Sequence, residues 1–98
     1  MTALPFGSTI GILGGGQLGR MMAMQAARLG YHVHIFTPEN DSPAAEVSLK
    51  TTVADWKDDA ALASFAKSVN VATLEFENIP ASAAETVAKH TAFYPSPD

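Results

Sequence analysis

The sequence contains no cysteine and no long uninterrupted hydrophobic run. The first absence excludes disulfide bonds, thiolate metal ligands and a cysteine nucleophile. The second excludes a membrane-spanning helix, which needs roughly 18 consecutive apolar residues. The apolar stretch 1–13 also lacks the basic residues and the cleavage site of a secretory signal peptide. We therefore expect a cytoplasmic protein without a membrane partner.

Basic residues are scarce, with six Lys and Arg against ten Asp and Glu, for a formal net charge of −4. The basic residues form no cluster, which disfavours a nucleic-acid partner or an anionic membrane surface. The three histidines, His32, His34 and His90, lack the spacing of a metal site. His32 and His34 fall on one face of an expected strand, where packing or surface exposure explains them better than metal binding.

Hydrophobic residues make up 47% of the chain, which indicates one folded domain with a real core. Short apolar runs alternate with helical periodicity, and this pattern predicts a Rossmann-like three-layer α/β domain with a parallel sheet, in the strand order 3-2-1-4-5. Residues 1–8 are expected to be a leader and residues 9–98 the domain. The expected strands are 9–13, 32–37, 49–53, 71–76 and 92–94. The expected helices are 17–29, a second containing 62–69 after a cap at Asp55 or Asp58, and a third from Pro80.

The first helix is expected to bury an apolar face. Its larger apolar residues recur at spacings of three and four, which favours packing against the sheet. The residues assigned to this buried face are Leu18, Met21, Met22, Ala26 and Leu29. Gly30 stands where a residue that ends a helix belongs.

Three glycines follow the first strand and fit the spacing G-x-G-x-x-G: Gly14, Gly16 and Gly19. Glycines at such a turn allow a ligand to approach the backbone, and the positive end of the helix dipole favours an anion. The motif therefore indicates a phosphate site. The alternative is a tight strand-to-helix turn that binds nothing.

A second informative stretch ends the fourth strand. Glu75 and Glu77 lie two residues apart and so point to one face of a strand. Carboxylates are costly to bury without partners. Either they accept hydrogen bonds from a ligand, or Glu77 and Asn78 satisfy amides at the start of the third helix.

Two motifs together resemble 5-(carboxyamino)imidazole ribonucleotide synthase, a family of ATP-grasp ligases in purine biosynthesis. Residues 11–21 read GILGGGQLGRM, and residues 75–80 read EFENIP where the family has Glu-Phe-Glu-Asn-Val-Pro at a matching separation. Residues 41–44 (DSPA) and 94–97 (YPSP) also look like family features. The resemblance covers about residues 9–98.

The resemblance implies an enzyme that carboxylates the exocyclic amine of 5-aminoimidazole ribonucleotide, using bicarbonate and MgATP through a carboxyphosphate intermediate. It implies that this chain is the N-terminal pre-ATP-grasp domain, without the ATP-grasp and C-terminal domains. MgATP is then bound by the absent domain, and the chain alone is expected to be inactive. The implied partners are the ribonucleotide and the remaining domains, with room for a homodimer of the full-length enzyme.

Carried over by position, the resemblance implies a ribonucleotide site and assigns no catalytic residue and no metal ligand to this chain. The residues implied to bind the ribonucleotide are Gly15, Gly16, Gln17, Leu18 and Glu77. Weaker candidates are Arg20, Glu75 and Asn78. For Arg20, a charge offered to the ligand and a solvated side chain remain equal alternatives.

Two other classes of function compete with this interpretation. A nicotinamide-dinucleotide domain of an oxidoreductase needs an acidic residue at the end of the second strand. That position holds Thr37 and then Pro38, and Glu39 falls in a turn. The third class is a non-catalytic assembly module, since domains of this kind also pack against partner domains. A reading frame that continues into an ATP-grasp domain would decide between these classes.

Overall fold

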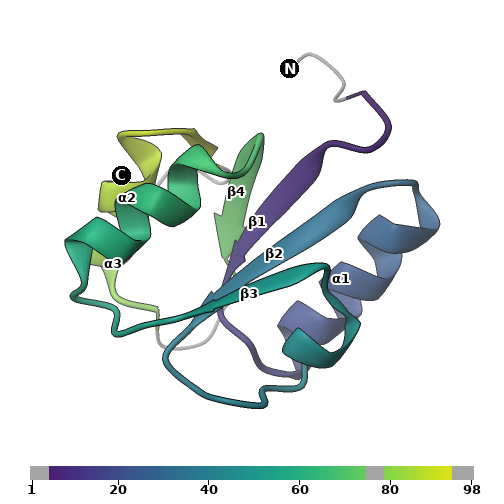
Figure 1. Cartoon of the computed structure of the whole chain (residues 1–98), viewed down its shortest axis with the longest axis horizontal. Helices are drawn as coiled ribbons and strands as arrows, with labels where there is room; N and C mark the ends of the chain where they lie inside the picture. The colour runs from purple at the N-terminus through teal and green to yellow at the C-terminus, as the bar shows by residue number, and fades with distance from the viewer. Residues whose placement is uncertain (1–4, 75–78, 94–98) are drawn as a thin grey trace.

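The computed structural model of the chain describes residues 5–74 and 79–93 (Figure 1). Strands and helices alternate along almost the whole of this length. In order they are β1 (Thr9–Leu13), α1 (Gln17–Arg28), β2 (His32–Thr37), the short 3-10 helix η1 (Ala45–Val47), β3 (Lys50–Val53), α2 (Asp59–Lys67), β4 (Val71–Leu74), α3 (Ala81–Ala88) and β5 (Ala92–Phe93).

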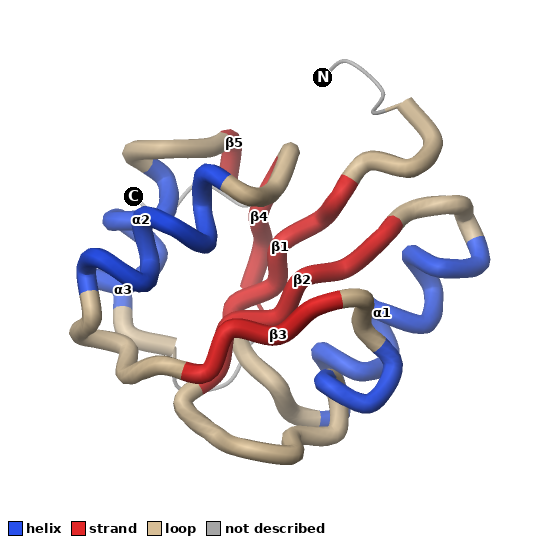
Figure 2. Tube along the Cα trace, in the orientation of Figure 1, coloured by secondary structure: helices blue, strands red, loops and turns tan. Residues whose placement is uncertain are grey.

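The five strands form one parallel sheet in the order β3-β2-β1-β4-β5. Figure 2 shows α1 on one side of this sheet and α2 with α3 on the other. The predicted α/β three-layer fold and the strand order 3-2-1-4-5 are therefore confirmed. Because β1 lies between β2 and β4, the chain reverses its direction of travel across the sheet at β1, and ligands bind at such a point in sheets of this type.

Each face of the sheet contributes side chains to its own hydrophobic cluster. Ile12 of β1 packs with Ala23 and Ala26 of α1. The neighbouring Leu13 packs instead with Phe36 and Phe65 on the side of α2 and α3. This alternation follows from the period of two along a strand.

The face that α1 turns toward the sheet differs from the predicted one. Its buried residues are Gly19, Ala23 and Ala26. Of the predicted face, only Ala26 is buried and Met22 half-buried, whereas Leu18, Met21 and Leu29 are 39%, 63% and 61% exposed. Small side chains let the helix approach the sheet closely, which leaves the larger ones on its flanks and outer side. The prediction was wrong because it weighed hydrophobicity and not side-chain size.

The end of α1 holds the segment before β1 in place. Gly30 adopts a positive φ of 89°, and the N–H groups of Gly30 and Tyr31 donate to the carbonyls of Ala27 and Ala26, which is a Schellman motif. The carbonyl of Gly30 in turn accepts a hydrogen bond from the N–H of Gly7 at 2.8 Å. The predicted helix end at Gly30 is confirmed.

The second and third helices follow the sequence pattern closely. Asp58 is the residue that caps α2, accepting a 3.0 Å hydrogen bond from the N–H of Ala61. The buried residues of the two helices are Leu62, Phe65 and Ala66 in α2, and Ala83, Ala84 and Val87 in α3. None of the helices in the described parts of the chain is long and apolar enough to cross a membrane.

His34 is a buried structural group in β2. Its Nδ1 and Nε2 lie 2.9 Å from Ser68 Oγ and 2.7 Å from Thr52 Oγ1. Ser68 Oγ already donates its hydrogen to the carbonyl of Phe65, so it accepts from Nδ1–H, and Nε2 accepts from Thr52. Burial, with a smaller effect of the Lys50 charge, lowers the pKa of His34 to about 4. The ring is therefore neutral at neutral pH, and packing explains this histidine as predicted, while His32 is exposed.

Candidate functional site

The glycine turn joins β1 to α1 at the carboxyl edge of the sheet. Gly14 has a φ of 116°, and its N–H donates to the carbonyl of Phe36 in β2 at 2.8 Å. Gly16 is the N-cap of α1 in an extended conformation, and its carbonyl accepts the N–H of Arg20 at 3.0 Å. The turn therefore starts the helix directly at the point where β1 ends.

The loop after β2 closes one side of this turn. Gly15 is buried, and a Cβ atom placed on it would lie 2.5 Å from Ser42 Oγ and 3.1 Å from Thr37 Cβ. The N–H of Ala44 donates to the carbonyl of Gly15 at 3.0 Å. Thr37 and Ser42 are each only 2% exposed. The absence of a side chain at Gly15 thus allows the 38–44 loop to pack directly on the turn.

Thr37 and Ser42 are residues that sequence reasoning did not assign to the site. Their hydroxyl groups form local bonds: Thr37 Oγ1 accepts the N–H of Glu39, and Ser42 Oγ accepts the N–H of Ala45. In the sequence, residues 38–43 form a turn-rich stretch, and residues 41–44 belong to the resemblance. The available signal was the cluster of turn-forming residues directly after an apolar strand.

The first turn of α1 faces solvent beside the glycines. Gln17 and Leu18 are exposed and Gly16 is half-buried. The first turn of α1 carries no acidic residue, and no side chain caps its N-terminus. A helix start of this kind favours an anion through its dipole and its backbone N–H groups. Gly16, Gln17 and Leu18 therefore present a surface suited to a phosphate group.

Arg20 forms an ion pair within the chain. Its Nη1 lies 2.9 Å from Oε1 of Glu46, a residue of η1, and the two side chains are 37% and 66% exposed. The pair links α1 to the loop that also packs on Gly15. The guanidinium is thus held by a carboxylate beside the site, an arrangement that neither of the two sequence alternatives described.

The three remaining candidates, Glu75, Glu77 and Asn78, lie outside the described residues. They follow Leu74, the last residue of β4, whose register partner in β1 is Leu13. The described end of β4 therefore lies beside the end of β1, directly before the glycine turn. A contact between these carboxylates and a ligand stays a prediction.

The described residues show no second chemical centre. Across 5–74 and 79–93, no group of three or more His, Asp or Glu side chains could hold a metal ion. Glu39, the acidic residue that a dinucleotide site would need, is exposed in the turn after β2. The arrangement at the helix start is suited to an anion.

Comparison with known proteins identifies the family of this domain. Residues 7–98 match the model of the ribonucleotide synthetase preATP-grasp domain. The N5-carboxyaminoimidazole ribonucleotide synthase of Brucella melitensis biotype 1 is 51% identical over 98% of this chain and 26% of the relative.

Two solved structures share the fold over nearly all of this chain. An ADP complex of N5-carboxyaminoimidazole ribonucleotide synthetase is 39% identical, with a TM-score of 0.89 over 96% of this chain and 25% of that protein. An Aspergillus clavatus N5-carboxyaminoimidazole synthase in complex with ADP and 5-aminoimidazole ribonucleotide is 34% identical, with a TM-score of 0.79 over 93% and 24%.

This chain spans about a quarter of the length of these relatives. The family match supports the resemblance noted in the sequence and decides against a dinucleotide-binding domain of an oxidoreductase. Because the family model matches residues 7–98, the chain belongs to the ribonucleotide synthetase preATP-grasp domain family.

Proposed function

We propose that this chain is the N-terminal domain of an ATP-dependent carbon–nitrogen ligase that carboxylates 5-aminoimidazole ribonucleotide with bicarbonate, giving N5-carboxyaminoimidazole ribonucleotide for purine synthesis. One observation carries the proposal. The Aspergillus clavatus relative, which shares this domain's fold, was crystallised with ADP and 5-aminoimidazole ribonucleotide. The glycine turn supplies the matching chemistry, because a ribonucleotide carries a phosphate and a helix start favours one.

In this proposal the chain binds and orients the ribonucleotide. The phosphate lies at Gly16, Gln17 and Leu18, where the exposed start of α1 offers backbone amides. Gly15 contributes by letting Ser42 and the 38–44 loop pack behind the turn. Glu77 accepts hydrogen bonds from the ribonucleotide, and Glu75, Asn78 and Arg20 are secondary candidates.

MgATP belongs to a separate ATP-grasp domain of the complete ligase in this proposal. Neither the glycine turn nor its surroundings supply a cluster of metal ligands within the described residues. In this proposal the chain contributes the ribonucleotide side of the active site. A cytoplasmic location, expected from the lack of a signal-peptide pattern, and a homodimer of the complete ligase, implied by the resemblance, remain predictions.

The proposal is tested by assaying the complete ligase and this chain side by side. The ligase is expected to release phosphate from ATP only when bicarbonate and the ribonucleotide are both present, with formation of the carboxylated product. This chain alone is expected to release no more phosphate than a control without protein. Robust ATP hydrolysis by the repurified chain would overturn its assignment as a binding domain. A ligase that releases phosphate from ATP at the same rate with and without the ribonucleotide would overturn the assigned reaction.

A further inference from the structure

One half of the sheet is covered on only one face by the described residues. Ala72 of β4 and Phe93 of β5 point toward α2 and α3 and are 0% and 7% exposed. Their neighbours on the opposite face are Val71 and Thr73, both half-buried, and Ala92, which is exposed. On that face α1 makes its sheet contacts with β1 and β2. On this face β4 and β5 therefore carry two apolar side chains, Val71 and Ala92, that the described residues do not bury.

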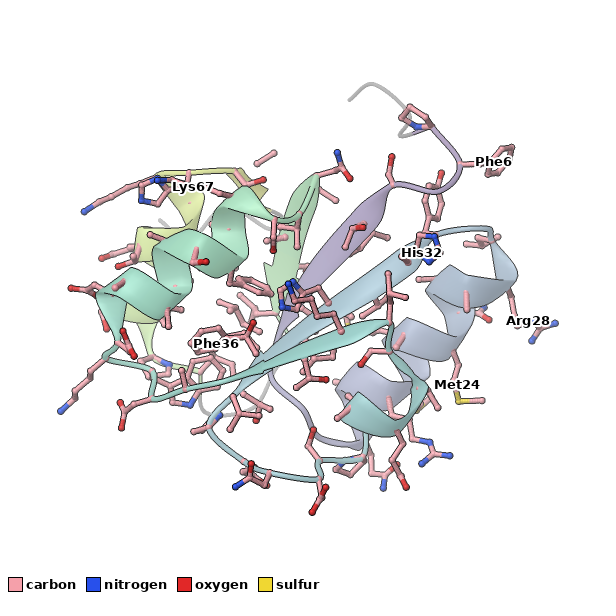
Figure 3. The ribbon with its side chains drawn as sticks, viewed as in Figure 1. Phe6, Met24, Arg28, His32, Phe36 and Lys67 are labelled. Carbon is pink, nitrogen blue, oxygen red and sulfur yellow. The ribbon has the colours of Figure 1, made fainter. Side chains whose placement is uncertain are left out.

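The flank of α1 that borders this open area carries a regular row of side chains. Leu18, Met22, Gln25 and Leu29 are separated by four, three and four residues, so they form one stripe along the helix. They line a groove of about 670 Å³ together with Ile10 of β1 and Tyr31. Met24 and Arg28 project from α1 away from the sheet at the outer rim of this region (Figure 3).

The geometry favours a helix as the occupant of this groove. Parallel sheets are normally covered by helices on both faces, and α1 leaves space for a second helix over β4. A stripe with alternating spacings of three and four is what a neighbouring helix packs against. The positive charge of α1 favours an occupant with an acidic residue, since the helix contains two arginines and no acidic residue. Arg20 is paired with Glu46, which leaves Arg28 to meet an acidic residue of the occupant.

The size of the groove favours a tethered occupant over a second copy of the chain. A helix of 12 residues such as α1 is only about 18 Å long. The groove is only about one helix long, whereas a stable interface between separate molecules buries roughly 800 Å² per partner. A segment of the same polypeptide is held at high effective concentration and needs less contact area. The relatives supply such a segment, because this domain makes up only about a quarter of their length.

We propose that an amphipathic helix from the remainder of the ligase packs in the groove that α1 forms with Ile10 of β1, on the side of β4, with its apolar face on Leu18, Met22 and Leu29 and an acidic residue near Arg28. This inference rests on the proposed function, since it needs the longer ligase. The groove is then an internal interface that completes the three-layer domain.

Introduced cysteines test this interface without any measurement of activity. The chain has no cysteine of its own, so Leu29→Cys in the groove and Leu49→Cys outside it can each be labelled selectively. Both leucines are well exposed, at 61% and 67%, so both variants are expected to fold. The rate of maleimide labelling is measured in this chain alone and in the complete ligase, after any cysteines of the remaining domains have been replaced.

We expect the complete ligase to slow labelling at Leu29→Cys by at least about tenfold, while labelling at Leu49→Cys changes much less. Equal labelling of Leu29→Cys in both proteins would overturn the proposal. Labelling is compared at low micromolar concentration, far below the millimolar range of weak self-association, and protection of Leu29→Cys in this chain alone at that concentration would also overturn the proposal, in favour of a second copy. Protection in a ligase that fails to carboxylate the ribonucleotide would refute the proposed function and leave this interface standing.

Discussion

Ser42 Oγ lies 2.5 Å from the point that a Cβ atom on Gly15 would occupy. The relationship joins two segments that are far apart in sequence: the turn before α1 and the loop after β2. Both residues are buried, and the N–H of Ala44 donates to the carbonyl of Gly15 next to this contact. The second glycine of the GGG run is therefore explained by packing within the chain, whatever the turn binds.

Gly15→Ala is expected to destabilise the domain by about 1–3 kcal/mol, because the added methyl group overpacks a site already filled by Ser42 and Thr37. Urea unfolding followed by circular dichroism measures the change. The double variant Gly15→Ala, Ser42→Gly should recover part of the loss, since it removes the two side-chain atoms of Ser42 that lie closest. A Gly15→Ala protein as stable as the parent would contradict the packing role.

Much of the fold could be predicted because its signals are local. The ends of β1 and β2 and the cap of α2 follow from apolar runs and from a capping residue whose effect extends over three or four positions. The order of the strands follows from the handedness of the connections, which depends on no single residue.

The buried face of α1 could not be predicted in the same way. Periodicity identifies a stripe of apolar residues but not how closely a helix approaches a sheet. Gly19, Ala23 and Ala26 define that approach through their small size. The larger Leu18 and Leu29 were assigned to the core but lie on a flank that still lacks a covering element within the described residues.

The candidate site was predictable only in part for a similar reason. The glycine spacing located the turn, and the comparisons identified its family. The role of Ser42 and the pairing of Arg20 with Glu46 depend on how the loop after β2 folds back, over a separation of more than twenty residues. No periodicity of the sequence encodes such contacts.

The neutral state of His34 predicts sensitivity to acid. The pKa of His34 is lowered to about 4 in the folded chain, below the ordinary value of 6.5, so the unfolded chain binds the proton more readily. Stability is therefore fully present above pH 6.5 and falls as the pH drops toward 4, by at most about 3 kcal/mol from this group. Urea unfolding between pH 7 and pH 4 measures the effect.

His34→Gln should lower stability at pH 7 but remove most of the dependence on pH in this window. His32→Gln is the matched control, because His32 lies on the same strand and is exposed. If the two variants showed the same pH dependence as the parent, another group would be responsible for the loss of stability in acid.

The groove beside α1 predicts self-association of this chain when it is studied alone. Its exposed apolar side chains are available to any apolar surface at high concentration. We expect an apolar dye to bind and sedimentation to show a growing dimer fraction toward millimolar concentration. Leu29→Gln should reduce both effects, whereas Leu49→Gln, an equally exposed leucine outside the groove, should change them little. A monomer without dye binding at all concentrations would contradict this expectation.

Glu77→Gln in the complete ligase separates ligand recognition from helix capping. The substitution keeps the size of the side chain but removes its charge, so loss of a charge-assisted hydrogen bond should weaken ribonucleotide binding by about 1.5–3 kcal/mol, with little change in stability. Gly16→Ala should weaken binding as well, because a methyl group enters the space assigned to the phosphate. Stability should change little, because Gly16 has an ordinary extended φ of −77° that alanine also adopts. Glu39→Gln is the control, since its exposed carboxylate would matter only to a dinucleotide.

Calorimetric titration with 5-aminoimidazole ribonucleotide measures binding by these variants, and thermal unfolding measures their stability. Normal binding by Glu77→Gln together with a sharply lowered melting temperature would make the carboxylate a structural cap, because capping stabilises the fold without contacting the ligand.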